Sequence, residues 1–305
     1  MNRLKLHFVA PLSYGNESLV GIRIALGLRI EKWGIQKAAS VISQCSPFDE
    51  EAVRLILREC FCLDEDENNA YVVAGSYELV VSDKRPLYPL HPGRIKSEGF
   101  GGCIGKTENT IRLMRLFKEG SIDVARFYLY EKKKGAIDPV FSSEGSLISP
   151  QSKYSISEKE RPELSAFLKQ HTVPLSPSYV QLAFDNFDQS YNNHDINLAF
   201  LSLMIAVEVL FNDGTSELKY RITRGMSVLL GDSQAQCREI YSHVKKLYDK
   251  RSHLVHTGKT AITAEDLIML RHYLRVSIKE LLHLRLSKTE LSAKLLEHGF
   301  GQRLT

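Results

Sequence analysis

Residues 248–258 read YDKRSHLVHTG and close a strongly periodic segment of the sequence. Upstream of them, apolar side chains recur at helical spacing, so we expect one long helix with a buried stripe formed by Cys237, Ile240, Tyr241, Val244, Leu247 and Tyr248. Arg251 continues the same line, and an arginine on a buried stripe needs an anionic partner or a pocket. Gly258 predicts the end of the helix, because glycine adopts the left-handed C-cap conformation without a steric clash. His256 then lies in the last turn or just beyond it.

The rest of residues 176–305 shows only helical patterns joined by short connections, which predicts a helical bundle. The segment 195–211 is apolar almost all round, so we expect it at the centre of the bundle. Glu208 is the one charge in its second half, and it is either exposed at an edge or paired with a buried cation. The candidate partners are Arg221, Arg224 and Arg251. A structural ion pair and a supporting role at a functional site both remain open for Glu208.

The other helices of this part are predicted from apolar stripes and capping residues. We expect a helix after Ser176 or Ser178 as its cap, and another from about Ser216 to Leu230 that stops at Gly231. Two capping boxes predict the starts of the last two helices, at residues 263–266 and 287–290.

Residues 1–140 form a mixed α and β part, so the fold class is an α+β domain followed by an all-α bundle. Alternating apolar residues predict strands within residues 4–8 and 22–30. A helix beginning at Ser46-Pro47, one or two strands over 70–82, a short helix over 110–118 and a strand over 124–130 complete this expectation. Residues 141–175 are rich in serine and glycine and then carry several prolines, which is typical of a linker, and we expect a short helix within it over residues 163–171.

Residues 99–107, GFGGCIGKT, are similar to a phosphate-binding loop only at first sight. That loop needs a glycine five positions before the Gly-Lys-Thr, and Phe100 occupies this position. We therefore expect a flexible glycine loop and no nucleotide cofactor.

Composition predicts an ordinary soluble protein. The chain has 305 residues, 43% hydrophobic residues and a formal net charge of +4. It shows no signal-peptide pattern and no apolar run of about 18 residues, so we expect a cytoplasmic protein without a membrane segment. The five cysteines lack zinc-site spacing, and we expect neither a metal nor another cofactor.

Positive charge is concentrated around the motif. Between Tyr241 and Thr260 five basic residues stand against one acid, Asp249. A solvated helical face and an RNA-binding surface both account for such a run. The basic residues other than Arg251 are Lys245, Lys246, Lys250 and Lys259.

Three segments together resemble the Apea-like branch of the HEPN superfamily: 205–211 with Glu208, 218–221 with Arg221, and 247–256 with the Arg-x4-His pattern of Arg251 and His256. The resemblance covers about residues 176–285. It implies metal-independent RNA cleavage, often in toxins or antiviral defence effectors, by two domains whose motifs line one cleft. Implied partners are RNA, a second copy of the chain, and an antitoxin or regulatory protein. The N-terminal part would then act as a sensor or regulator.

The residue types suit this chemistry. A histidine that titrates near neutral pH exchanges protons with ribose or leaving oxygens, and a forked arginine stabilises charge on the scissile phosphate. No metal is strictly needed, because RNA carries its own 2′-hydroxyl nucleophile. We expect Arg251 and His256 to be catalytic, with Ser252, Glu208, Tyr248 and Arg221 in support.

Two features keep an alternative open. Five positions at about 100° each place Arg251 and His256 some 140° apart on an unbroken helix, which favours a two-fold dimer or a helix that ends before His256. Ser252 stands where active members often carry Asn, Asp or His. In the alternative, the bundle binds RNA or a protein without cutting, and Arg251 is a structural partner of Glu208.

Overall fold

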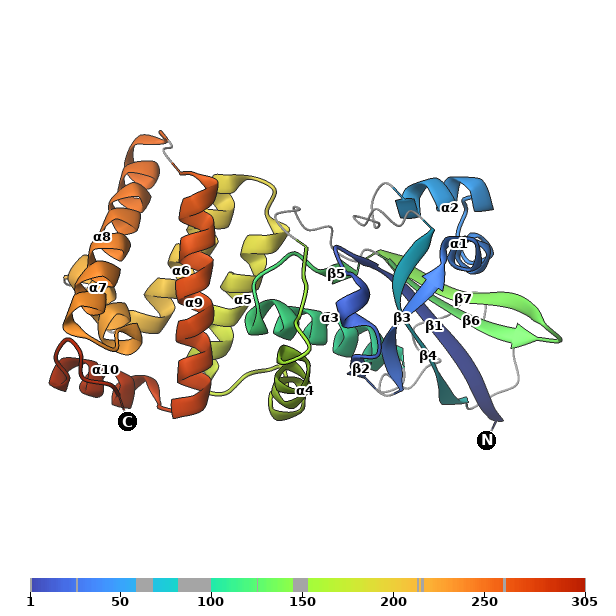
Figure 1. Ribbon diagram of the computed structural model, residues 1–305, viewed down its shortest axis with the longest axis horizontal. Helices are drawn as coiled ribbons and strands as arrows, with labels where there is room; N and C mark the ends of the chain where they lie inside the picture. Colours follow the sequence, from blue (N-terminus) through green and yellow to red (C-terminus); the bar gives the residue numbers. More distant parts are fainter. Residues whose placement is uncertain are drawn as a thin grey trace. The chain divides into compact units, whose positions relative to one another are not determined.

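The computed structural model describes residues 2–25, 27–58, 68–81, 100–124, 126–144, 153–212, 214, 217–259 and 262–304. The chain divides into two compact units, residues 1–170 and 171–305. The first unit is an α+β domain built on an antiparallel sheet, and helices alone form the second unit (Figure 1). The expected fold class is therefore confirmed.

The sheet of the first unit has seven strands in the order β2-β3-β4-β1-β6-β7, with β5 paired to β1. All of these pairings are antiparallel. The strands are β1 (Asn2–Ser13), β2 (Arg23–Ala25), β3 (Leu28–Gly34), β4 (Asn69–Val81), β5 (Asp123–Val124), β6 (Arg126–Lys133) and β7 (Ala136–Glu144).

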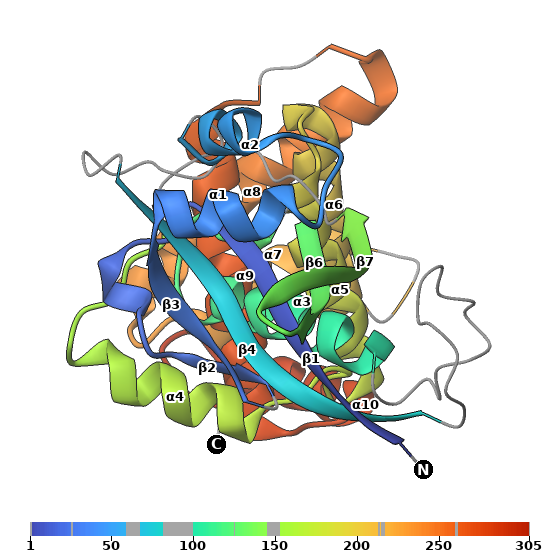
Figure 2. The same ribbon diagram turned by 90° about the vertical axis from the view of Figure 1, so that its right-hand side faces the viewer.

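Each face of the sheet has its own apolar core, because successive side chains of a strand point to opposite faces. Leu6 and Phe8 pack with residues of α3 (Phe100–Phe117) and α4 (Glu160–Gln170). Val9 and Val72 pack with α1 (Ile35–Ser43) and α2 (Glu50–Ile56) on the opposite face. Figure 2 shows α1 and α2 together on one side of the strands. A 3-10 turn, η1 (Glu17–Leu19), precedes β2.

The second unit contains six helices within its described residues: α5 (Ser178–Asn192), α6 (Ile196–Phe211), α7 (Leu218–Leu230), α8 (Gln234–Thr257), α9 (Ala264–Leu284) and α10 (Lys288–Glu297). Both predicted capping boxes are present, at Thr263 with Asp266 and at Ser287 with Glu290. The expected serine cap of α5 is wrong, because Pro177 stands at that position and gives no side-chain cap.

Helix α6 is central, since it packs against α5, α7, α8 and α9. This agrees with its predicted central position, although the helix is not buried all round. Leu198 is 55% exposed and Ile205 is 46% exposed, so one face of this apolar helix reaches the surface.

The expectation of a flexible glycine loop at residues 99–107 is wrong over its described part, residues 100–107, which form the first turns of α3. Gly99 lies outside the described residues. Cys103, Thr107, Ile111 and Met114 recur at helical spacing and are buried, so packing outweighs the helix cost of about 1 kcal/mol for each glycine.

Two further features of the first unit differ from expectation. Helix α1 was not predicted, and α2 begins at Glu50 with Asp49 as its cap, because the Asp49 carboxylate accepts from the Ala52 N–H at 2.8 Å. The predicted linker, residues 141–175, includes the end of β7 and also α4, which overlaps the short helix expected over residues 163–171. Tyr154 within this stretch is fully buried in the first unit. Within the described residues, no helix is both long and apolar enough to cross a membrane.

Candidate active site on the motif helix

Helix α8, the motif helix, carries Arg251 and His256 without a break between them. It ends as predicted at Gly258, whose φ is +67° and whose N–H donates to the Leu254 carbonyl at 3.0 Å. His256 therefore lies in the last turn of the helix. The alternative in which the helix ends before His256 is wrong.

Arg251 lies at the edge of the buried stripe and pairs with Glu208 of α6. Its Nη2 is 3.1 Å from Glu208 Oε1, and the two side chains are 26% and 22% exposed. Among the three candidate arginines, Arg251 is thus the one in contact with Glu208. Arg224 instead donates to the carbonyls of Leu295 and His298.

The Arg251–Glu208 contact is an ion pair rather than an aligned hydrogen bond. Glu208 Oε1 is buried and has no hydrogen-bond partner within the described structure, although Arg251 Nη2 lies close to it. We therefore attribute the contact to charge attraction, which restrains the guanidinium less strictly than a two-bond fork would. About a quarter of the Arg251 side chain stays accessible to an incoming group.

Two predicted supporting residues surround this pair differently. The Arg251 guanidinium carbon lies 5.9 Å from the centre of the Tyr248 ring. Burial raises the pKa of Tyr248, Glu208 raises it further, and Arg251 and Lys219 oppose these effects, so its hydroxyl stays protonated at neutral pH. The guanidinium of Arg221 on α7 lies beside Gly214.

His256 is exposed and points to another side of the helix from Arg251. Five positions of an unbroken α-helix rotate a side chain by roughly 140°. Ser252, half-buried, is only about 40° from His256 around the same helix. The neighbouring His253 is also exposed, and its Nδ1 lies 3.3 Å from the Thr257 hydroxyl. One chain therefore does not bring Arg251 and His256 to a common phosphate.

The predicted RNA-binding lysines fall into two groups. Lys245, Lys246 and Lys259 are exposed. Lys250 is instead engaged, with its Nζ 2.5 Å from Asp266 Oδ2 at the capping box of α9. Burial favours a higher pKa for Asp266, but the bonds from Lys250 and from the Thr263 N–H outweigh it and hold that pKa below its ordinary value.

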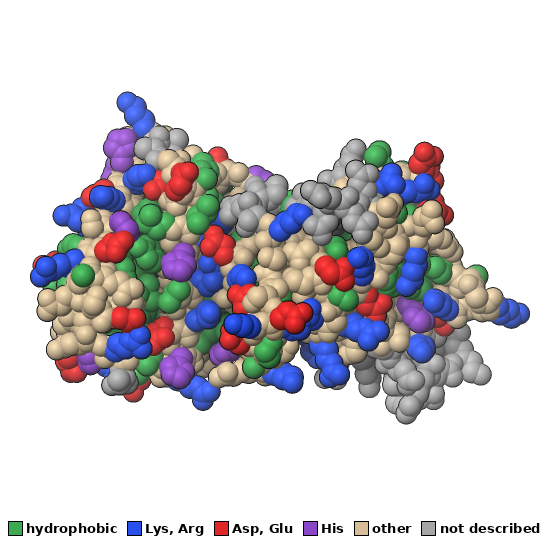
Figure 3. Space-filling view, in the orientation of Figure 1, with side chains coloured by type: hydrophobic (Ala, Val, Ile, Leu, Met, Phe, Trp, Pro, Cys, Tyr) green, Lys and Arg blue, Asp and Glu red, His purple; other side chains and the backbone are tan. Residues whose placement is uncertain are grey.

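Exposed apolar side chains flank the Arg251–Glu208 pair on both helices. Ile205 precedes Glu208 by one turn, and Val255, 51% exposed, follows Arg251 by one turn. Figure 3 shows that apolar side chains also reach the surface of this unit over α8 and α9. The large exposed apolar residues of the second unit are Leu182, Leu198, Ile205, Tyr220, Val255, Ile268, Val276 and Leu296.

Comparison with protein-family models, with curated protein sequences and with solved structures gives no significant match. Among the described residues, no group of three or more His, Cys, Asp or Glu side chains is arranged to hold a metal ion. Sequence reasoning assigned no role to individual residues of the first unit, yet a basic hollow lies there around Arg29, Trp33 and Lys132. The signal available in the sequence was the placing of Arg29, Glu31 and Trp33 at alternate positions, with Trp33 the only tryptophan of the chain.

Proposed function

We propose that the protein is a metal-independent endoribonuclease of the HEPN type that acts as a homodimer, with Arg251 and His256 as catalytic residues. The observation that carries this proposal is the state of Arg251. The carboxylate of Glu208 orients it, a quarter of its side chain is accessible, and it lies on the same capped helix as the exposed His256. An oriented, accessible guanidinium is suited to a phosphate.

The reaction follows from these two groups. A histidine removes the proton of a ribose 2′-hydroxyl, and the 2′-oxygen forms a bond to the adjacent phosphorus. The bond from phosphorus to the 5′-oxygen breaks, and that oxygen takes a proton from the second histidine of the dimer or from water. Arg251 stabilises the charge on the phosphate oxygens. The products are a 2′,3′-cyclic phosphate and a 5′-hydroxyl.

A second copy of the chain resolves the geometric problem. Arg251 and His256 diverge by roughly 140° on one helix, but two helices related by a two-fold axis present both groups to one cleft. The exposed Ile205 and Val255 beside the ion pair supply apolar surface for such an interface. Lys245, Lys246 and Lys259 remain exposed to attract the RNA backbone.

A second candidate is a non-catalytic module that binds RNA or a protein. The Arg251–Glu208 ion pair favours it, because an arginine that neutralises a partly buried carboxylate has a structural role without any substrate. In this case His256 only interacts favourably with the C-terminal end of the helix.

Incubation of the purified protein with total RNA and tRNA in EDTA separates the two candidates. The nuclease leaves 2′,3′-cyclic phosphate ends in the presence of the chelator. Arg251→Ala and His256→Ala should each lower the cleavage rate by about 100-fold or more. Retained cleavage in both variants would exclude this site.

Two control variants make the assignment specific. Arg251→Lys keeps the charge but loses the fork, so we expect a loss nearly as large as that of Arg251→Ala. His253→Ala removes the other exposed histidine of the same turn and should leave the rate within about twofold. RNA that binds in a gel shift but remains intact would support the binding module.

A further inference from the structure

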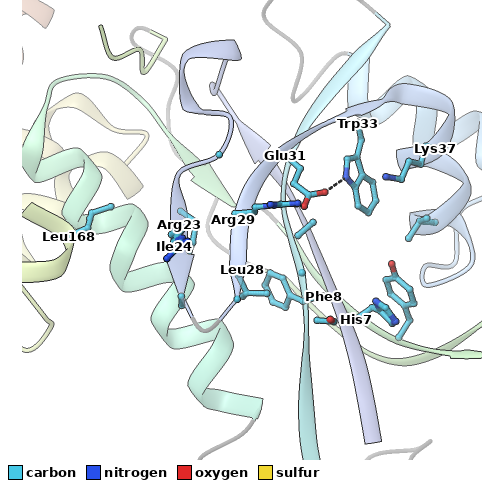
Figure 4. A pocket seen from close by; sticks show the side chains of 18 of the residues that line it. His7, Phe8, Arg23, Ile24, Leu28, Arg29, Glu31, Trp33, Lys37 and Leu168 are labelled. Carbon is cyan, nitrogen blue, oxygen red and sulfur yellow. Dashed lines mark hydrogen bonds and ion pairs between the residues drawn. The ribbon is translucent and has the colours of Figure 1, made fainter. Parts of the chain in front are cut away.

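The first unit contains a large hollow on its sheet, with a volume of about 1170 Å³. Strands β1, β2, β3, β4 and β6 and helices α1 and α4 all contribute to its wall. In Figure 4, Arg29 and Glu31 lie near the middle, with Arg23 and Leu168 on one side and Trp33, Lys37 and His7 on the other. Ligand sites commonly measure about 300–1,000 Å³, so the hollow exceeds the needs of a small inorganic ion.

The lining is strongly basic. Among the described residues, five cationic side chains border the hollow, namely Arg23, Arg29, Lys37, Lys132 and Lys169, against one carboxylate, that of Glu31. All five are exposed. Within the described part of the chain, Arg23, Lys132 and Lys169 form no ion pair with an acidic residue. The excess of positive charge selects an anion as the occupant.

The one carboxylate is already engaged by the wall itself. Glu31 Oε1 accepts from Arg29 Nε at 2.8 Å, and Oε2 accepts from Trp33 Nε1 at 2.8 Å. Burial favours a higher pKa for Glu31, but these two hydrogen bonds outweigh it and lower the pKa. Glu31 therefore fixes the positions of Arg29 and Trp33 and does not repel an anion as a free carboxylate would.

Aromatic rings form part of the same wall. His7 and Tyr130 stack, with ring centres 5.2 Å apart and an angle of 16° between their planes. Lys37 Nζ lies 3.9 Å from the centre of the Trp33 ring. Trp33 and Tyr130 are 7% and 4% exposed, so the partly exposed ring of His7 is the aromatic surface that a base can reach. A flat ring beside cations can hold a base by stacking and its phosphate by charge.

The electrostatic environment of His7 also indicates a positive potential in the hollow. Burial lowers the pKa of His7, and Lys132 and Lys5 lower it further. An anion bound beside Lys132 would offset part of that positive potential.

We propose that this hollow binds a nucleoside phosphate, with the base toward His7 and Lys132 and the phosphates at Arg23 and Arg29, which face each other on β2 and β3. The site is separate from the motif helix and does not depend on RNA cleavage. The ligand is a free nucleotide or a segment of single-stranded nucleic acid, since both carry a base joined to a phosphate.

Trp33 provides a direct test, because it is the only tryptophan of the chain and borders the hollow. The full-length protein is titrated with ATP, with a 5′-phosphorylated single-stranded oligodeoxynucleotide, or with inorganic phosphate, while tryptophan fluorescence is recorded. The oligodeoxynucleotide lacks the 2′-hydroxyl, so failure of the nuclease proposal cannot affect the result. Calorimetry on the same samples supplies a readout that does not rely on Trp33.

A saturable response to ATP would identify a free nucleotide as the ligand, and a response to the oligonucleotide alone would identify a strand. Arg23→Gln with Lys132→Gln should weaken binding by about tenfold or more, since a hydrogen bond to a charged group contributes roughly 1.5–3 kcal/mol. The matched control Lys134→Gln, two positions from Lys132 and outside the lining, should change the affinity less than about twofold.

Three results would overturn the proposal. The first is that neither ATP nor the oligodeoxynucleotide binds saturably up to about 1 mM. The second is an equal response to inorganic phosphate and to ATP. The third is an unchanged affinity for these probes in the Arg23→Gln, Lys132→Gln double variant. Circular dichroism of the double variant establishes that it is folded.

Discussion

Arg251 lies at the point where the stripe of the motif helix passes from core to surface. Leu247 and Leu254 on either side of it are buried, while Arg251 keeps a quarter of its side chain exposed. Helical spacing alone predicted the position on the stripe and the need for an anion. It left three arginines as candidate partners of Glu208, because the spacing of residues does not fix how two helices pack.

Glu208→Gln tests whether the ion pair orients Arg251 or mainly stabilises the fold. A partly exposed pair contributes little, so we expect the free energy of unfolding to fall by no more than about 1 kcal/mol. RNA cleavage should fall by about tenfold, because the guanidinium loses its orientation. Urea denaturation and cleavage rates measure the two effects. Glu239→Gln, an exposed site on the motif helix α8, serves as the control. A large loss of stability with unchanged cleavage would contradict the expectation.

Asp266 gives a pH-dependent prediction, because its pKa in the folded protein lies below the ordinary value of 3.8. Stability from this carboxylate is present above the unfolded-state pKa and is lost as the pH falls through the lower folded-state pKa. Asp266→Asn should therefore lower the Tm at pH 7, by an amount that corresponds to about 1 kcal/mol for a capping residue. The difference in Tm between the variant and the wild type should shrink below about pH 4. Thermal melts from pH 3 to 7 measure this difference. A Tm difference that grows in acid would refute the prediction.

At the scale of elements, prediction succeeded where packing pattern and local chemistry agree. The motif helix, the two capping boxes and the strands β1 and β3 combine clear periodicity with recognisable ends. It failed where tertiary packing overrides local preference. Helix α3 contains three glycines within its first turns, yet it forms because its side with Cys103 and Thr107 is buried. Helix α1 was missed because it is too short to show a clear helical period in the sequence.

The glycines of α3 offer a stabilisation test. Among the described atoms, a Cβ on Gly102 or Gly105 would meet nothing within 4 Å. Gly102→Ala and Gly105→Ala should each raise the free energy of unfolding by about 0.5–1 kcal/mol, because alanine loses less backbone entropy in a helix. Chemical denaturation measures this gain.

Gly120→Ala is the contrasting control. Its φ is +139°, and a Cβ there would lie 2.8 Å from the Tyr154 Cα, so this variant should be destabilised. Destabilisation by the two α3 variants would show that those turns are not the regular helix described.

At the scale of the whole molecule, sites draw on residues distant in sequence. The basic hollow brings together His7, Arg29 and Lys132 through the order and register of β1, β3 and β6. Alternation of side chains along one strand predicts which residues share a face but not which strands are neighbours or how they are aligned. Arg251 and His256, which we propose as catalytic residues, are close in sequence, so the sequence alone suggested them. Their separation of roughly 140° around the helix was also predictable. The second copy of the chain that we propose to bring them together is not specified by the sequence of one chain.

The central claim is that Arg251 of one copy and His256 of another act on the same phosphate. Arg251→Ala and His256→Ala chains with different affinity tags are co-expressed, and the mixed dimer is purified through both tags. It retains one arginine and one histidine in the shared cleft, so it should cleave RNA in EDTA at least about tenfold faster than either variant homodimer. A mixed dimer no faster than the two variant homodimers would contradict the claim.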